Sequence, residues 1–282
     1  MPRISLSTLL KCLVAVAVIA LTAYISTLTL NPQGKVEETT GVGWVEEVRI
    51  LIVYDNTLFN RSLKASWGFA CVVELDNESI LFDTGGDPET LLSNMAKMGV
   101  DTSKITRVVL SHIHGDHTGG LFGFLELRGG VTIYVPSSFP RSFKDLAESY
   151  GCEVVEISGP TVIREGVAST GEMGTWIKEQ ALIVNTSRGA IVITGCAHPG
   201  VVNMVERAKE IAGDVYMVLG GFHLAGASRS EVVKIAQQLD ELGVKLVAPC
   251  HCTGENAKAV FRELYGERFV EIGVGAVLEV KP

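Results

Sequence analysis

The sequence predicts an α/β fold in which two β-sheets pack face to face with helices on the outside, after a hydrophobic N-terminal helix. Short strand patterns dominate from Val48 to Phe82, and a mixture of helices and strands follows. Strands alternate with helices from Ala190 onward. This order of elements also fits a doubly wound parallel sheet. A cluster of histidines directly after one expected strand, described below, favours the two-sheet arrangement.

The strands are expected in short runs rich in β-branched residues, and turn residues such as Asp76 and Asn77 separate neighbouring runs. These runs are Val48–Tyr54, Ala70–Leu75, Ser79–Phe82, Thr106–Leu110, Val131–Val135, Glu153–Ile157, Leu182–Asn185, Ala190–Thr194, Val215–Leu219, Lys245–Ala248 and Arg268–Val280. The helices are expected where the pattern is helical, and Pro88 occupies a tolerated first-turn position. They are Pro88–Met98, Arg141–Tyr150, Val201–Ile211, Arg229–Leu242 and Ala257–Leu264.

The composition is that of a globular domain with a full core, since 47% of the 282 residues are hydrophobic and 20% are charged. The 24 basic and 32 acidic residues give a formal net charge of −8. An acidic surface repels a phosphate backbone, so no nucleic-acid partner is expected. A small-molecule substrate is expected instead. An anionic substrate is compatible with this charge, because a bound metal sets the local field.

The N-terminal segment Leu13–Leu30 contains no charged residue, and its length is close to the roughly 20 residues that a bilayer-spanning helix needs. Arg3 and Lys11 precede it and Glu37 follows it, so the positive-inside tendency places the following domain outside the cytoplasm. The sequence therefore predicts a membrane-anchored chain. The alternative is a cleaved signal peptide followed by secretion. A buried core helix is disfavoured because the segment has no polar face.

The chain is expected to divide into three parts. Residues 1–30 form the anchor or signal segment. Residues 31–46, which include Pro32 and Gly34, form a linker. Residues 47–282 form the folded domain.

Three imidazoles and one carboxylate fall within six positions directly after an apolar strand: His112, His114, Asp116 and His117. In an extended segment the first two histidines point the same way, so two nitrogens can bind one ion at about 2.0–2.1 Å. Gly115 lets the chain turn, so that Asp116 and His117 reach a second position beside the first. The alternative, a polar surface loop, explains this spacing of ligand types poorly.

The other histidines strengthen this prediction. His198, His223 and His251 each follow a predicted strand. In α/β architectures, functional sites gather at the carboxyl ends of strands. The sequence therefore predicts that all of the histidines contribute to one region of the fold.

The motif SHIHGDHTGG (Ser111–Gly120) occurs together with LFDTG (Leu81–Gly85), the ITG of Ile193–Gly195, and His251. On these residues the chain resembles the metallo-β-lactamase superfamily. Gly195–Asn203, Gly220–Leu224 and Cys250–Gly254 are similar to the branch named for 7,8-dihydropterin-6-yl-methyl-4-(β-D-ribofuranosyl)aminobenzene 5'-phosphate synthase. The resemblance implies a four-layer αββα metallo-β-lactamase sandwich.

The resemblance also implies a ligand set. His112, His114 and a later histidine would hold one ion, and Asp116, His117 and His251 would hold a second. Asp83 would orient a ligand imidazole through a hydrogen bond, although an Asp before Thr84 also suits a turn.

The chain departs from the superfamily after the ITG strand, where a bridging carboxylate is expected and Cys196 stands instead. Either Cys196 or His198 can supply a ligand there. His198 is preferred because imidazole is a common zinc ligand. One or two zinc ions are expected. An iron or manganese site and a mononuclear site stay open.

The remaining candidates have weaker patterns. His223 is expected to donate a hydrogen bond to an anionic group of the substrate, with a structural loop histidine as the alternative. Asn56 lines the pocket or makes a turn. Glu179 supports a ligand or lies exposed. Cys250 and Cys252 are expected to be small buried thiols.

The predicted function is that of a metal-dependent hydrolase. Zinc-bound hydroxide would attack an ester, lactone, amide or phosphoester bond, and Asp116 would ligate, orient the nucleophile and take up a proton. Two alternatives stay open. One is a transferase like the synthase for which the branch is named, and the other is a non-catalytic, membrane-tethered metal-binding protein.

Overall fold

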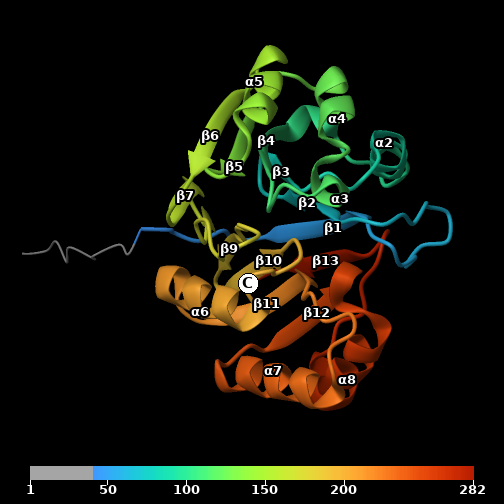
Figure 1. Cartoon of the computed structure of the whole chain (residues 1–282), viewed down its shortest axis with the longest axis vertical. Helices are drawn as coiled ribbons and strands as arrows, with labels where there is room; N and C mark the ends of the chain where they lie inside the picture. Colours follow the sequence, from blue (N-terminus) through green and yellow to red (C-terminus); the bar gives the residue numbers. More distant parts are fainter. Residues whose placement is uncertain (1–40) are drawn as a thin grey trace, which may run out of the picture. The chain divides into compact units, whose positions relative to one another are not determined.

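Two β-sheets packed face to face form the centre of the computed structural model, which describes residues 41–282 (Figure 1). The first sheet has seven strands in the order β13-β1-β2-β3-β4-β5-β6, and the second has six in the order β12-β11-β10-β9-β8-β7. The first sheet comprises β1 (Val48–Tyr54), β2 (Ala70–Glu74), β3 (Ser79–Phe82), β4 (Ile105–Val109), β5 (Thr132–Pro136), β6 (Glu153–Ile157) and β13 (Val277–Val280). The second comprises β7 (Thr161–Arg164), β8 (Val167–Ser169), β9 (Leu182–Thr186), β10 (Gly189–Thr194), β11 (Val215–Gly221) and β12 (Leu246–Cys250).

Helices cover the outer face of each sheet (Figure 1). On the first sheet these are α2 (Pro88–Lys97), α4 (Leu121–Leu127) and α5 (Arg141–Ser149). On the second sheet they are α6 (Val201–Ala212), α7 (Arg229–Glu241) and α8 (Glu255–Tyr265). Shorter turns are α3 (Gly115–Thr118), η1 (Thr102–Lys104), η2 (His251–Thr253) and η3 (Gly266–Arg268).

Apolar side chains fill the space between the sheets. Ile52, Phe82 and Val109 of the first sheet share one buried cluster with Ile193 and Leu219 of the second. A second cluster lies between the first sheet and its helices, and a third lies between the second sheet and its helices. The four-layer αββα arrangement predicted for the folded domain is therefore the one observed.

Each sheet has an antiparallel half and a parallel half. In the first sheet β3, β4, β5 and β6 run parallel, and in the second β10, β11 and β12 do. Parallel neighbours end at the same edge of a sheet, so the segments that follow β3, β4, β10, β11 and β12 are brought together. These segments contain all of the predicted metal ligands together with Asp83 and His223.

The structure differs from the prediction at four elements, which are β7, β8, β13 and α4. The expected strand Arg268–Val280 is a strand only over Val277–Val280, because the preceding segment turns tightly at Gly273 and Gly275, where a Cβ would meet neighbouring atoms at 2.6 and 2.4 Å. Strands β7 and β8 were missed; they form a short hairpin with Gly166 at φ 74°. Helix α4 was missed because Gly123 weakens its helical pattern, but that glycine lets the helix approach Pro88.

The membrane-anchored, extracytoplasmic localisation predicted from the sequence is corrected. Within residues 41–282 no helix is long and apolar enough to cross a bilayer. The expected hydrophobic helix of residues 1–30 lies outside the described residues. The anchored localisation, with its alternative of secretion after cleavage, is withdrawn.

Candidate metal centre

Two groups of three potential ligands lie side by side at the carboxyl ends of the parallel strands. The first group is His112, His114 and His198, whose ligand atoms all lie within 4.8 Å of one another. The Nε2 atom of His112 lies 3.1 Å from Nδ1 of His114. We call these residues the first triad. Its members follow β4 and β10, so they come from different sheets.

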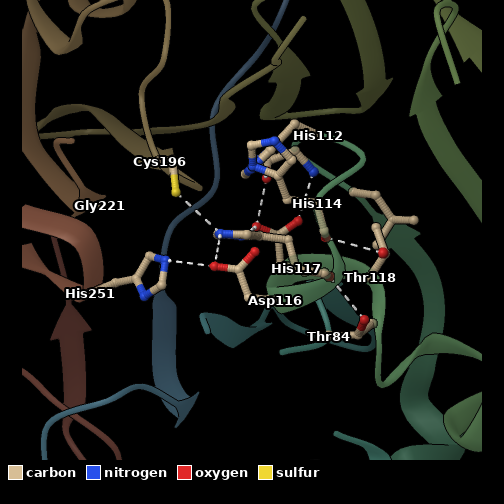
Figure 2. Close-up of polar contacts among 12 residues, drawn as sticks. Thr84, His112, His114, Asp116, His117, Thr118, Cys196, Gly221 and His251 are labelled. Atoms are coloured by element: carbon tan, nitrogen blue, oxygen red, sulfur yellow. Dashed lines mark hydrogen bonds and ion pairs between the residues drawn. The ribbon is translucent and has the colours of Figure 1, made fainter. Parts of the chain in front are cut away.

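The second triad consists of Asp116, His117 and His251, which meet the same distance criterion (Figure 2). One oxygen of Asp116, Oδ2, lies 3.7 Å from His117 Nε2 and 3.4 Å from His251 Nε2. Asp116 and His117 belong to the single turn α3, and His251 opens η2 directly after β12. The turn that was expected at Gly115 is thus a short helix.

These distances fit a metal ion. A tetrahedral zinc ion with bonds of about 2.0–2.3 Å holds its ligand atoms about 3.3–3.7 Å apart, which is close to the separations in the second triad. The Nε2 atom of His251 is buried and has no hydrogen-bond partner. A buried polar atom without a partner is costly, and a bound cation would satisfy it.

Acceptors beside the centre select the tautomer of three of the ligand imidazoles. His117 Nδ1 donates to Asp83 Oδ2 at 2.7 Å, His198 Nδ1 donates to Glu179 Oε2 at 2.7 Å, and His251 Nδ1 donates to Asn56 Oδ1 at 3.0 Å. In each case the proton sits on Nδ1, so Nε2 offers its lone pair to the centre.

Asp83 orients the histidine motif through its hydrogen bonds with Ser111 and His117. Its Oδ1 accepts from the Ser111 backbone N–H and its Oδ2 accepts from the Ser111 hydroxyl, both at 2.7 Å. Because the Ser111 proton is donated to Asp83, His112 Nδ1 donates to Ser111 Oγ, leaving His112 Nε2 free. Burial raises the pKa of Asp83 to about 7. The hydrogen bond between Asp83 and the His117 imidazole is the contact predicted from the resemblance.

Glu179 is the residue that the sequence pattern predicted least clearly. It is fully buried, and it accepts hydrogen bonds from the backbone N–H groups of Cys196, Ala197 and His198 at 2.8–2.9 Å. Burial acts to raise its pKa, but the hydrogen bonds from His198 and the nearby His112 hold it at about 2. Glu179 is thus an ionised carboxylate that fixes both the loop after β10 and the His198 ring.

Burial keeps the two central imidazoles neutral. Burial, followed by the nearby imidazole of His117, lowers the pKa of His112 to about 3, and burial, followed by the nearby His251, lowers the pKa of His117 to about 4. A neutral imidazole is the form that binds a metal. At neutral pH both side chains are therefore ready to act as ligands.

Backbone strain is concentrated at this centre. Within residues 41–282, the non-glycine residues with positive φ are Asp83, Ala197, His223 and His251, at 48–58°. All four belong to the centre or to the loops that form it. Such conformations cost about 1–3 kcal/mol each and persist where the surrounding structure requires them, which is common at functional sites.

Three further side chains surround the triads. The His223 ring lies 4.6 Å from the His198 ring. The potential ligand atoms of His223, His198 and Cys196 all lie within 4.8 Å of one another. The ligand atoms of Cys252, Cys196 and His251 form another set within the same distance. The structure thus places His223 beside the first triad but in neither triad, and its predicted role toward substrate stays a prediction.

An aromatic side chain and a cavity adjoin the centre. Trp67 is 58% exposed, and its ring lies 4.9 Å from that of His251. A cavity of about 330 Å³ begins at His198 and His223 and extends between α6 and α7 to Gln238. No spacing pattern in the sequence indicates Trp67, because its contact with His251 joins two segments that lie far apart in the chain.

Comparison with known proteins places the chain in a family. A model of the metallo-beta-lactamase superfamily matches residues 68–208. A Methanocaldococcus jannaschii relative, 7,8-dihydropterin-6-methyl-4-(beta-D-ribofuranosyl)-aminobenzene-5'-phosphate synthase, is 29% identical over 84% of this chain and 98% of its own length.

Solved structures give the same result. Tm1679, described as a metal-dependent hydrolase of the beta-lactamase superfamily, superposes with a TM-score of 0.69 at 28% identity, covering 83% of this chain and all of the other. The metallo-beta-lactamase fold protein YhfI from Bacillus subtilis superposes with a TM-score of 0.63 at 13% identity, over 83% of this chain and all of the other, which supports the fold alone. The chain belongs to the metallo-beta-lactamase superfamily.

Proposed function

We propose that this protein is a metal-dependent hydrolase that acts on an ester, lactone, amide or phosphoester bond of a small molecule. The observation that carries the proposal is the pair of adjacent triads, in which His117, His198 and His251 are each oriented by an acceptor on Nδ1. We propose zinc as the metal, bound at one or both triads. When bound, it would lower the pKa of water to about 7 and polarise the bond to be cleaved.

Asp116 is the acid that we assign to proton transfer. Its side chain is 22% exposed, whereas those of His117 and His251 are fully buried, so it is the member of the second triad that a substrate can reach. Its Oδ2 faces the two imidazoles, which leaves Oδ1 to accept a proton from the attacking water and return it to the leaving group.

His223 is the donor that we assign to the substrate. It lines the cavity with its ring tilted against that of His198, and a ring N–H there can hydrogen-bond the oxygen that gains negative charge. Trp67 adds an exposed apolar side chain next to His251. Together they would position the reacting bond over the triads.

A second candidate function, a transferase, is favoured by the relative whose name is that of a synthase. A phosphorylated substrate would need cationic side chains near the centre. The described residues that line the adjoining cavity include neither Lys nor Arg, and Glu231 is their one carboxylate. This lining offers no Lys or Arg to the phosphate of a phosphoribosyl donor and therefore favours the hydrolase over the transferase.

The test is metal analysis of the full chain coupled to a panel of lactones, β-lactams, thioesters and phosphodiesters, with His114→Ala as the inactive variant. About two zinc ions per chain, with turnover that the variant loses, would support the hydrolase. Bound metal without turnover would favour the synthase-like transferase, to be assayed with an aminobenzoate and a phosphoribosyl donor. Absence of bound metal would refute the metal centre.

A further inference from the structure

The sulfur of Cys196 lies between the two triads. It forms one set of neighbouring ligand atoms with His112 and His117, a second set with His198 and His223, and a third set with His251 and Cys252. Members of both triads are therefore within 4.8 Å of this one atom. Its distance to His117 Nε2, the nitrogen that faces the centre, is 3.3 Å, which is a separation that two ligands of one ion adopt.

The other buried acids near the centre are already engaged. Asp83 accepts from Ser111 and His117, and Glu179 accepts from three backbone N–H groups and from His198. Neither carboxylate has an oxygen directed at both triads. Asp116 is thus the one carboxylate ligand among the described members of the triads.

The end of β11 supplies no side chain to the centre. A Cβ at Gly221 would lie 2.4 Å from the Gly195 carbonyl oxygen and 2.7 Å from the Cys252 sulfur. An acid at that position would not fit. Gly221 therefore places no side chain in the centre, whereas Figure 2 shows the side chain of Cys196 directed toward His117.

We infer that the Cys196 thiolate is a shared ligand of the two triads and makes the centre selective for thiophilic metals such as zinc. The inference rests on the proposed metal centre. Cys196 would lose its thiol proton to solvent on metal binding and form a sulfur–metal bond in place of the S–H bond. The thiolate adds a negative charge between two cations, which the neutral imidazoles do not. Thiolate ligands favour zinc over manganese or magnesium.

Cys252 is the matched control. It is also buried beside the centre, and its thiol donates to the Cys196 carbonyl oxygen at 3.7 Å. Its sulfur belongs to a set of neighbouring ligand atoms with His251, but to no such set with a member of the first triad. A role limited to packing would make Cys196→Ser and Cys252→Ser behave alike.

The test is absorption spectroscopy of the full chain loaded with Co²⁺, in which visible d–d bands report metal binding and a near-ultraviolet sulfur-to-cobalt band reports thiolate ligation. The sulfur band is expected in the unmodified protein, in Cys252→Ser and in the remote variant Cys152→Ser. It is expected to disappear in Cys196→Ser while the d–d bands remain. A sulfur band that survives Cys196→Ser, or that Cys252→Ser abolishes, would overturn the assignment.

The same spectra separate the two proposals. Absence of d–d bands in the unmodified protein would refute the metal centre itself, and with it this inference. Strong d–d bands without any sulfur band would refute the role of Cys196 and leave the triads intact. Competition between Zn²⁺ and Mn²⁺ gives a second measurement: Cys196→Ser is expected to reduce the preference for zinc by about tenfold or more. An unchanged preference would contradict the inference.

Discussion

Single residues around the triads do most of their work through hydrogen bonds to a ligand. The ligands themselves could be predicted from sequence because His112, His114, Asp116 and His117 lie within one short motif. Of their supports, the resemblance indicates Asp83 and the pattern leaves Glu179 open, but neither points to Asn56 as the partner of His251. Asn56 contacts His251 across 195 positions, and only the fold brings the two together. A residue whose role depends on such a distant partner has no local signal.

Replacing Glu179 by Gln is expected to weaken metal binding by about 10–100-fold, because His198 loses the carboxylate that orients its ring and raises its basicity. The fold should be retained, since the amide oxygen can still accept from the backbone. Equilibrium titration with zinc measures the change. Glu172→Gln is the matched control, because Glu172 accepts from Ser137 and Ser138 away from both triads. Equal weakening by both substitutions would contradict this account.

Asp55 gives a pH-dependent prediction for the metal-free protein. Burial raises its pKa from 3.8 to about 6. Its contribution to stability is therefore fully present below pH 3.8 and is lost as the pH rises through 6. Asp55→Asn removes this titration. The difference in free energy of unfolding, variant minus unmodified protein, should therefore rise by about 2–3 kcal/mol between pH 4 and 7. Urea unfolding at several pH values measures the difference, and a difference independent of pH would refute the assignment.

At the scale of elements, the carboxyl ends of the parallel strands determine where the centre forms. Strands β4, β10 and β12 deliver the ligands, and β3 delivers Asp83. The longer strands and helices could be predicted from periodicity. The hairpin β7–β8 could not, since its strands have 4 and 3 residues and too few apolar positions for a pattern.

The close approach of β10 and β11 can be tested at Gly221. Gly221→Ala places a Cβ 2.4 Å from a backbone oxygen, so the strand end must move, and a cost of about 1–3 kcal/mol in the free energy of unfolding is expected. Zinc affinity should fall as well, because Cys196 and Cys252 lie against this position. Gly159→Ala, where a Cβ meets nothing within 4 Å, is the control and should change neither quantity by much. A harmless Gly221→Ala would contradict the packing described.

At the scale of the domain, the centre joins the two sheets. The ligands after β4 belong to the first sheet, while His198 and His251 follow strands of the second. A metal ion held by both sets would act as a cross-link that the unfolded chain lacks. The motif predicted this family from sequence, but the way in which the two sheets share the ligands required the structure.

Removal of metal is therefore expected to lower the melting temperature. Zinc at about 100 times its dissociation constant should add about 2.7 kcal/mol to the free energy of unfolding. Calorimetry with and without a chelator measures the shift. His114→Ala, which lacks one ligand of the first triad, should show a smaller shift, and an equal shift in this variant would mean that the stabilising zinc binds elsewhere.

The central claim is that two adjacent triads hold metal ions, and anomalous X-ray scattering at the zinc edge tests it most directly. Crystals of the zinc-loaded chain are expected to show two anomalous peaks, one among His112, His114 and His198 and the other among Asp116, His117 and His251. The Cys196 sulfur is expected to lie within bonding distance of both peaks. Zinc-loaded crystals with no peak at either triad would contradict the account.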